Sequence, residues 1–468
     1  MSLKKVKEIV LKIRTAEIFS AVLIFTAVTA AELYMNVGIR TVAGIVVFLA
    51  ALMIASYILV KVYFPQILRS PKNILLVETL VVLMLFFVII IKFNQALPVY
   101  FLPVASAGIL LSVLISPALS VVGVFIITAF MLTVTGFSFE LFTIYFFGGI
   151  AGSYAARSVR NRRDLNRCGL YVLGVNTLTI GAFGLIGGGS IIDTGVNIAW
   201  GAGNAFVAII IAGGLLPFYE NIFKLTTDIK LLELGDFNHP VLKRLMLEAP
   251  GTYHHSLMVG NLAEHACQQI GANPLLARVS AYYHDIGKLK NPQYFIENQA
   301  EAANKHDNLK SNISALILKR HVKDGVKLAR KHSLDQVIID CIQQHHGTTL
   351  MGYFYDKVLK ETDDKDGIDK DEFRYPGPLP GTKEGGVIML ADSVEAACRS
   401  LEEPSFSRIS AVVTKIINNK FIDNQLSKCE ITLANLEQIQ KSFISTLSGI
   451  YHSRIEYPED KEETSVEQ

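Results

Sequence analysis

A group of histidines and aspartates in the second half of the chain carries side-chain types that bind divalent metals. The group contains an adjacent His-Asp pair and an adjacent His-His pair, and its members are His255, His284, Asp285, His321, His345, His346 and Asp392. In the His-Asp pair the carboxylate has two oxygens and can bridge two ions, whereas each imidazole binds only one ion. This set suits hydrolysis by two metal ions, which activate a water and stabilise a departing oxygen.

The other histidines are assigned ordinary structural roles. A lone helical histidine is more often a surface or capped core residue than a ligand; this applies to His239, His265, His306, His332 and His452. His254 precedes His255, and adjacent helical residues point about 100° apart, so one of the two points away from a shared site. Neutral imidazoles combined with carboxylates favour a borderline divalent ion such as Fe, Mn, Zn or Co.

The residues that carry this chemistry lie in segments predicted to be helical. One helix begins at Ala249–Thr252 and stops near Gly271, and the next begins at Asn273-Pro274, a capping residue followed by proline at the first helical position. Further helices are predicted at about 310–331, 334–346, 385–401, 406–421 and 433–450. The acidic run 361–372 and the string Tyr375-Pro376-Gly377-Pro378 are predicted to form a long loop between His346 and Asp392. Because no alternating strand pattern of useful length occurs, the predicted fold is all-α.

The first half of the chain is dominated by apolar runs. A helix needs about 20 apolar residues to cross a bilayer. Eight candidate spans are found, at about 17–35, 40–60, 74–91, 97–115, 118–135, 139–156, 169–190 and 198–218. Lysines and arginines cluster at the N-terminus, at 61–72 and at 157–167. These three regions lie on the same side of the membrane if all eight segments cross it. The positive-inside rule then predicts that both ends and the soluble half face the cytoplasm.

Two features of this half leave alternatives open. The segment 17–35 carries Glu17 and Glu32 at its edges, and if it lay on the membrane surface, seven spans and an outside N-terminus would remain. Glu78, a few residues inside the third span, is either a functional group or an anchor at the membrane interface. Pro217 is expected to end the last span.

Long ordered motifs make the chain resemble the bacterial transmembrane HD-domain phosphohydrolases, in which seven spans precede a cytoplasmic HD domain. The resemblance covers about 38–457 and rests on six strings: Pro-Gly-Thr-Tyr-His-His-Ser-Leu-Met-Val (250–259), His-Asp-Ile-Gly-Lys (284–288), His-Val-Lys-Asp-Gly (321–325), His-His-Gly-Thr-Thr (345–349), Arg-Tyr-Pro-Gly-Pro (374–378) and Ala-Asp-Ser-Val-Glu-Ala (391–396). Characterised members are cyclic di-AMP phosphodiesterases, which linearise the dinucleotide to pApA. The resemblance therefore implies a membrane-anchored, metal-dependent phosphodiesterase in the inner (cytoplasmic) membrane.

The resemblance also implies a ligand set for two divalent ions, with Fe or Mn as the expected metals. One ion would take His255, His284, Asp285 and Asp392, and the other would take Asp285, His321, His345 and His346, with Asp285 as the bridge. A hydroxide between the ions would attack phosphorus in line with the departing 3′ oxygen. Lys288 lies one helical turn beyond His284 if the helix continues past Gly287, and it is then expected to stabilise a non-bridging oxygen of the phosphate. The alternative is that Lys288 is a solvated lysine near a helix end.

Substrate contacts are less well specified by the sequence. Arg374, Tyr375 and Arg399 are candidate contacts with the nucleotide, although each arginine could equally be a surface charge. Relatives that cleave cyclic di-GMP carry a Gly-Tyr-Pro signature after the His-His pair, whereas this chain continues with Gly-Thr-Thr-Leu, which disfavours that substrate. Relatives also place a sizeable extracellular domain after the first span, where this chain has only Met35–Ile39.

These arguments give a domain plan and a set of partners. The plan is a basic segment with a first span (1–36), a seven-span region (37–219), a connector (220–249), an HD phosphohydrolase domain (250–456) and a disordered tail (457–468). The partners are cyclic di-AMP and the lipid bilayer; the net charge of +2 gives no indication of a nucleic-acid polymer. Another nucleotide substrate, a nucleotide receptor without turnover, a transporter with a soluble regulatory domain, and association as a homodimer stay open.

Overall fold

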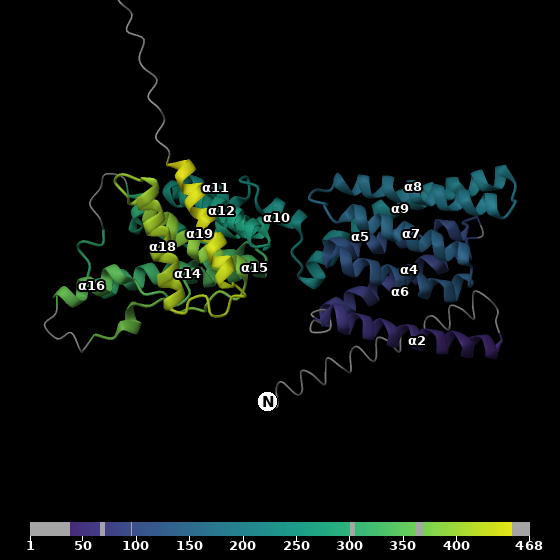
Figure 1. Ribbon diagram of the computed structural model, residues 1–468, viewed down its shortest axis with the longest axis horizontal. Coiled ribbons are helices and arrows are strands. Elements are labelled where there is room, and N and C mark those ends of the chain that lie inside the picture. Colours follow the sequence, from purple (N-terminus) through teal and green to yellow (C-terminus); the bar gives the residue numbers. More distant parts are fainter. Residues whose placement is uncertain (1–37, 66–70, 95, 300–304, 362–367, 452–468) are drawn as a thin grey trace, which may run out of the picture. The chain divides into compact units, whose positions relative to one another are not determined.

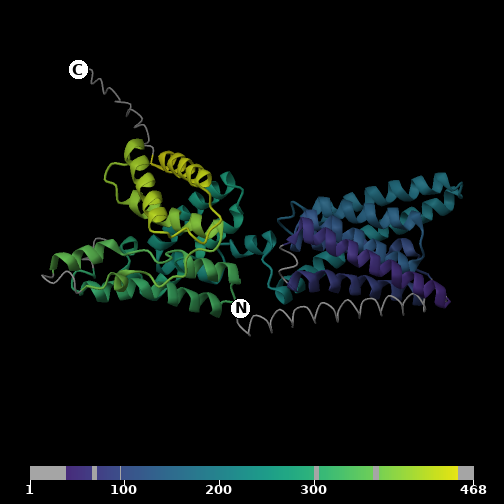
Figure 2. The ribbon, with the colours of Figure 1, turned by 60° about the horizontal axis from the view of Figure 1, so that its bottom comes forward.

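The computed structural model shows an all-helical protein that divides into two compact units at Lys230 (Figures 1 and 2). The structure describes residues 38–65, 71–94, 96–299, 305–361 and 368–451. Within these ranges there is no strand, and a single isolated bridge joins Leu350 to Arg374. The all-α prediction is therefore confirmed.

The first unit is a set of apolar helices. They are α2 (Ile39–Tyr63), α4 (Pro71–Phe93), the short 3₁₀ turn η1 (Val99–Phe101), α5 (Val104–Leu114), α6 (Pro117–Thr135), α7 (Phe139–Ala156), α8 (Asp164–Ile186) and α9 (Ile191–Phe223). Serine side chains cap α6, α7 and α9, since Ser116, Ser138 and Ser190 each accept a hydrogen bond from the first turn of their helix.

The outer surface of this unit is apolar, which identifies a membrane protein. Leu178, Ile192 and Phe206 on α8 and α9 are exposed, as large apolar side chains are when lipid replaces water. By length and composition alone, four helices within the described residues can cross a membrane: Arg40–Tyr63, Lys72–Ile91, Asp164–Ile186 and Ile191–Phe223. The predicted span 17–35 lies outside the described residues.

Seven of the predicted spans coincide with described helices, with two differences in detail. The span predicted at 97–115 is broken, because Pro103 lies between η1 and an α5 of only 11 residues. The expectation that Pro217 ends the last span is wrong, since α9 continues through it to Phe223. Proline is tolerated inside membrane helices because neighbouring groups satisfy the freed backbone carbonyl.

Small residues allow the short helix α5 to pack closely in the middle of the unit. A Cβ on Gly108 would lie 2.6 Å from Gly149 O on α7 and 2.7 Å from Ser153 Oγ. Close approach of this kind is how helices associate in lipid, where apolar side chains gain little by leaving the solvent.

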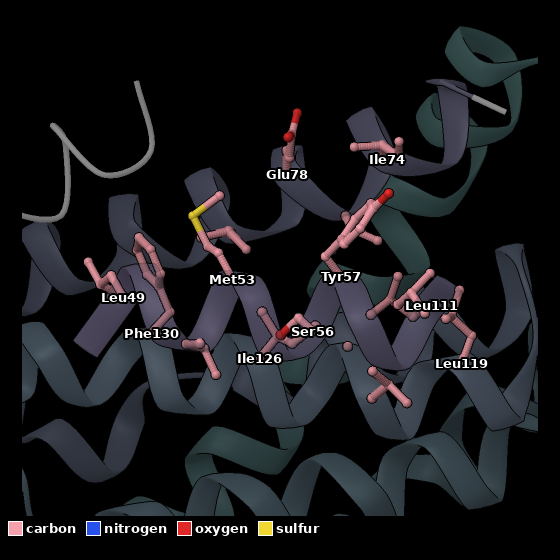
Figure 3. Close-up of a pocket in the computed structure, with 16 residues that line it drawn as sticks. Leu49, Met53, Ser56, Tyr57, Ile74, Glu78, Leu111, Leu119, Ile126 and Phe130 are labelled. Atoms are coloured by element: carbon pink, nitrogen blue, oxygen red, sulfur yellow. The ribbon is translucent and has the colours of Figure 1, made fainter. Parts of the chain in front are cut away.

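A cavity of about 210 Å³ lies among α2, α4, α5 and α6 (Figure 3). Its walls are almost entirely apolar, and Tyr57, Ser56 and Glu78 are its polar lining residues. The side chain of Glu78 is buried. Its position inside the helical set, rather than on an outer face, favours the functional interpretation of Glu78 over the interfacial one.

The second unit consists of short helices and 3₁₀ turns that follow the connector helices α10 (Asp228–Leu234) and α11 (Pro240–Glu248). They are α12 (Pro250–Gln269), α13 (Pro274–Tyr283), η2 (Ile286–Lys290), η3 (Pro292–Tyr294), η4 (Ile296–Asn298), α14 (Ser311–Lys331), α15 (Gln336–Gln344), α16 (Gly352–Glu361), η5 (Lys370–Phe373), α17 (Lys383–Arg399), α18 (Phe406–Ile422) and α19 (Leu433–Ile450). Helices α12, α17, α18 and α19 share one core, and α11, α13 and α15 share another.

Three local differences from the sequence-based prediction matter for the site. Helix α16 occupies part of the stretch predicted to be a loop. Helix α15 ends at Gln344, so His345 and His346 lie in the turn that follows it. The helix that leads to His284 does not continue past Gly287, because η2 replaces it.

Gly287 permits η2 to lie against the backbone of α14. A Cβ at this position would lie 1.8 Å from His321 O and 2.5 Å from Gly325 N. These are backbone atoms, which cannot move aside without shifting the helix that carries His321. The glycine therefore sets the distance between two elements of the candidate site.

Replacing Gly287 by alanine should lower the free energy of unfolding of this unit by about 3 kcal/mol, because the added Cβ forces η2 and α14 apart. Thermal unfolding of the detergent-solubilised protein measures the change. The matched control is Gly352→Ala at the start of α16, where an added Cβ meets nothing within 4 Å. Equal unfolding midpoints for the two variants would contradict the proposed close contact.

Candidate metal centre

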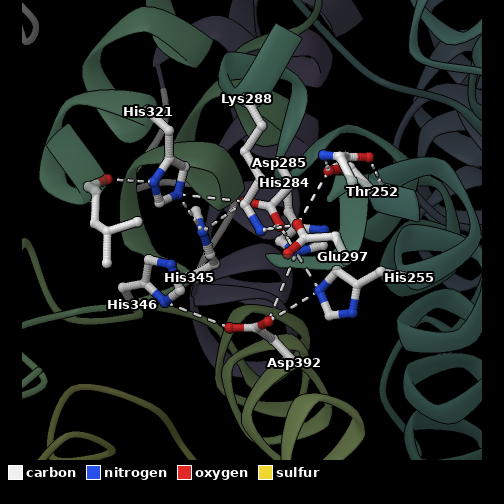
Figure 4. A network of polar contacts seen from close by, with 12 residues as sticks. Thr252, His255, His284, Asp285, Lys288, Glu297, His321, His345, His346 and Asp392 are labelled. Carbon is white, nitrogen blue, oxygen red and sulfur yellow. Dashed lines mark hydrogen bonds and ion pairs between the residues drawn. The ribbon is translucent and has the colours of Figure 1, made fainter. Parts of the chain in front are cut away.

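The helices of the second unit bring the histidines and aspartates into one buried cluster (Figure 4). His255 comes from α12, His284 and Asp285 from the end of α13, His321 from α14, His345 and His346 from the turn after α15, and Asp392 from α17. His284 and Asp285 are completely buried, and within each of two groups the potential ligand atoms lie within 4.8 Å of one another. Helix ends supply several of these residues because backbone turns there aim side chains inward.

Asp285 belongs to both groups, and each of its oxygens faces one of them. Oδ2 lies 3.1 Å from His284 Nε2 and 3.7 Å from His255 Nε2. Oδ1 lies 3.3 Å from His321 Nε2 and 3.6 Å from His345 Nε2. This is the geometry that a bridging carboxylate requires.

Asp392 connects the two groups from the opposite side. Its Oδ1 lies 3.1 Å from His255 Nε2 and 3.9 Å from His284 Nε2, while its Oδ2 lies 3.4 Å from His346 Nδ1. The residues thus divide into His255, His284, Asp285 and Asp392 on one side and Asp285, His321, His345 and His346 on the other. These are the two ligand sets that the family resemblance implies.

Backbone carbonyls fix the orientation of three of the imidazoles. His284, His321 and His345 each donate a hydrogen bond from Nδ1 to the carbonyl three residues earlier, at 2.6, 2.5 and 2.8 Å respectively. The proton on Nδ1 leaves Nε2 with its lone pair directed at the cluster, which is the form of histidine that binds metal. Helix geometry therefore selects the tautomer.

His255 is oriented by a carboxylate instead, and this partner was missed by the analysis of the sequence. Its Nδ1 contacts the buried side chain of Glu395. Glu395 lies three residues after Asp392 on α17, so both carboxylates occupy one face of that helix. The spacing Asp-x-x-Glu within the string 391–396 was the signal that could have identified it.

The buried charges shift the pKa values in directions set by their neighbours. Burial opposes ionisation of Asp285, but Lys288 and His284 hold the pKa of this carboxyl well below its usual range. Burial also opposes protonation of His255, yet the carboxylates of Asp392 and Glu395 raise its pKa to about 9. Burial lowers the pKa of His321 to about 4, so this imidazole is neutral.

Unsatisfied polar atoms show that the cluster fits metal ions. His284 Nε2 and both oxygens of Asp285 are buried without a hydrogen bond of regular geometry among the described residues, although the ammonium group of Lys288 lies 2.7 Å from Asp285 Oδ2. Buried polar groups normally have regular hydrogen bonds, so the lack of them at these atoms is consistent with a ligand that the protein itself does not supply. Nitrogen and carboxylate donors at these separations match a divalent ion.

Lys288 lies beside the cluster, although by a different route from the predicted helical turn. Its Nζ lies 2.7 Å from Asp285 Oδ2 and 2.7 Å from Glu297 Oε1, and Glu297 also accepts a hydrogen bond from Thr252 Oγ1 at 3.0 Å. Glu297 was not found from the sequence, which offers no spacing that links it to Lys288.

A cavity of about 600 Å³ opens onto the cluster, and it contains some of the predicted substrate contacts. Lys288, Tyr375 and Arg399 line it, together with His346 and Asp392. The ring of Tyr375 stacks on His346, with centroids 4.2 Å apart, and Arg399 lies 3.5 Å from Glu395 Oε1.

Arg374 has a different position from the other candidate contacts. Its guanidinium forms two hydrogen bonds with Asp423, at 2.8 and 2.9 Å, and a third with Thr348 O at 2.8 Å. It is not among the residues that line the cavity. Its contacts hold the segment between His346 and Tyr375 against the C-terminal end of α18.

Comparisons with known proteins agree with this architecture. Residues 39–227 match the family model "7TM receptor with intracellular HD hydrolase", and residues 252–397 match the HD domain. The chain belongs to the transmembrane HD-domain family.

Two curated relatives of this chain carry the name cyclic-di-AMP phosphodiesterase PgpH. The protein from Bacillus subtilis is 39% identical over 87% of this chain and 59% of its own length, and the protein from Listeria monocytogenes is 37% identical over 91% and 60%. The chain thus spans about three fifths of the length of these relatives. A solved structure of the PgpH HD domain from L. monocytogenes in complex with cyclic-di-AMP is 46% identical to this chain, with a TM-score of 0.44. The match covers 47% of this chain and the whole length of the solved domain.

The contact between Glu395 and His255 leads to a prediction about metal affinity. Replacing Glu395 by glutamine should weaken metal binding by about 10- to 100-fold, because His255 loses the carboxylate that orients its ring and raises its basicity. Titration of the metal-stripped protein with Mn²⁺ measures the affinity. The exposed Glu402, outside the cluster, provides the control Glu402→Gln; equal affinities for the two variants would exclude this role of Glu395.

The raised pKa of His255 predicts that metal binding releases a proton. Near pH 7.5 the metal-free imidazole is protonated, since its pKa is about 9, and it must lose that proton to bind an ion. Metal affinity should therefore rise with pH up to about 9. Calorimetric titration in two buffers of different ionisation enthalpy should show release of about one proton, and a heat independent of the buffer would refute the linkage.

Proposed function

We propose that this chain is a metal-dependent phosphodiesterase, anchored in the inner (cytoplasmic) membrane, that hydrolyses cyclic di-AMP to pApA. The observation that carries the proposal is the position of Asp285, whose two oxygens face two separate groups of histidines. A binuclear centre of this kind suits hydrolysis of a phosphodiester. The names of the curated relatives supply the choice of substrate.

Two ions, with Fe or Mn as the proposed metals, would be held by the two groups. His255, His284, Asp285 and Asp392 would hold one, and Asp285, His321, His345 and His346 would hold the other. When bound, such ions lower the pKa of a water between them and offset the negative charge that develops on a phosphate.

The protein's own side chains would orient the substrate and balance its charge. Lys288, which is fixed by Asp285 and Glu297, would place its ammonium group next to a non-bridging oxygen of the phosphate under attack. Arg399 is half-exposed on the cavity wall and is available to a phosphate or to an adenine edge. Tyr375, stacked on His346, offers an aromatic face at the cavity wall.

In this proposal the HD domain faces the cytoplasm, and the distribution of positive charge in the membrane unit supports this orientation. Arg157, Arg160, Arg162 and Arg163 lie between α7 and α8, and Arg167 lies in the first turn of α8. Such a concentration of arginines between two membrane helices is typical of a cytoplasmic loop. A cytoplasmic HD domain has direct access to a nucleotide second messenger.

Replacement of Asp285 by asparagine should reduce turnover of cyclic di-AMP by more than about 100-fold, because even residues that only support metal ligands contribute about 10- to 100-fold. Product analysis on the detergent-purified protein, loaded with Mn²⁺ or with Fe²⁺ under anaerobic conditions, follows the formation of pApA. The control Asp356→Asn changes an exposed aspartate on α16 and should retain full activity.

The same assay decides between the proposal and its alternatives. Cyclic di-GMP and a panel of nucleoside phosphates are supplied in parallel. Preferred turnover of another nucleotide would keep the metal centre and overturn the substrate, and binding of cyclic di-AMP without turnover at any metal loading would indicate a receptor.

A further inference from the structure

Lys420 is a buried lysine on the wall of the cavity that opens onto the cluster. It lies near the end of α18, and only 8% of its surface is exposed. Its Nζ donates a hydrogen bond to Thr349 Oγ1 at 2.7 Å. An ammonium group has three N–H donors, so this contact uses one of them and two stay available to the cavity.

No carboxylate among the described residues forms an ion pair with Lys420, because the two nearby acids are engaged elsewhere. Asp423 accepts hydrogen bonds from Arg374 at 2.8 and 2.9 Å and from Gln425 Nε2 at 2.9 Å. Asp392 faces His255 and His346, at 3.1 and 3.4 Å. The pKa of Lys420 reflects this arrangement, since burial lowers it to about 8 despite the attraction of both carboxylates.

A buried ammonium group without its own counter-ion is unfavourable, and proteins keep such groups where a ligand supplies the charge. The ligand must be an anion with oxygen acceptors, because both the free N–H donors and the neighbouring hydroxyl of Thr349 offer hydrogen bonds. A phosphate satisfies both requirements.

This position is close to the cluster but separate from the lysine already assigned there. The backbone N–H of Thr349 donates to His346 O at 3.1 Å, so the threonine lies one turn beyond a candidate metal ligand. Lys288 belongs to η2 and is held by Asp285 and Glu297. Besides Arg399 on α17, the cavity therefore has a lysine on each of two further elements, Lys288 on η2 and Lys420 on α18, and its volume of about 600 Å³ exceeds what a single phosphate needs.

We propose that Lys420 and Thr349 form a second phosphate subsite, which holds the phosphodiester of the dinucleotide that is not being cleaved. This assignment rests on the proposed function, since only a substrate with two phosphates can occupy both points. It gives the site a means of preferring cyclic dinucleotides over compounds with a single phosphodiester. A purely structural bond between α18 and the segment after His346 is the competing explanation.

The test compares two substrates with the Mn²⁺-loaded protein, both units of the chain included. Lys420→Met removes the charge and keeps most of the volume of the side chain. For cyclic di-AMP it should raise KM by about 10- to 100-fold, the usual contribution of a charged hydrogen bond, with little change in kcat. For bis(p-nitrophenyl) phosphate, which has one phosphodiester, kcat/KM should change less than about twofold because the subsite stays empty.

Two further variants separate binding from folding. Thr349→Val removes the hydroxyl but keeps the lysine, and it should raise KM for cyclic di-AMP by a smaller factor. Lys415→Met changes an exposed lysine on the same helix and should match the wild type with both substrates. An unchanged KM for cyclic di-AMP in Lys420→Met, or an equal loss with both substrates, would overturn the subsite.

Equilibrium binding of pApA to the Mn²⁺-loaded protein keeps this inference independent of turnover. Absence of cyclic di-AMP hydrolysis by the wild type would contradict the proposed function alone. In that case, binding of pApA that is about 10-fold weaker or more in Lys420→Met supports the subsite, and equal binding by the two proteins overturns it.

Discussion

The second unit depends on a negative charge buried at its centre. Asp285 is completely enclosed, and an isolated carboxylate in such a place would be strongly destabilising. Lys288 and the surrounding imidazoles offset that charge, and holding them in place requires contributions from α12, α13, α14 and α15 together. The packing of these helices therefore brings together the groups that offset the charge of one buried carboxylate.

Helix ends carry out much of this positioning. His284 and His345 lie just beyond the last residues of α13 and α15, and each of them donates Nδ1–H to a carbonyl of the turn behind it. One interaction thus adds a hydrogen bond to a carbonyl of the last helical turn and orients a ligand nitrogen. His255 lies within α12, and Glu395 takes the place of the carbonyl there.

The two halves of the chain meet different solvents, and their helices are stabilised differently. In the membrane unit, close contact through small residues such as Gly108 replaces the hydrophobic effect. In the second unit, apolar cores lie under helices whose outer faces are polar. Close backbone contact occurs there as well, at Gly287, but it serves to set the distance between η2 and α14 rather than to drive association.

The sequence by itself determined the all-α class, the apolar first half and the identity of the candidate metal-binding side chains, because periodicity, hydropathy and residue chemistry are local properties. It did not determine the break before α5, the course of α9 through Pro217 or the presence of α16, since neighbouring helices decide whether a proline or a polar stretch is tolerated. Glu395, Glu297 and Lys420 acquire their roles only through contacts across 140, 9 and 71 residues of sequence. Tertiary structure alone creates such contacts, because burial and charge pairing act on distance in space and not on order along the chain.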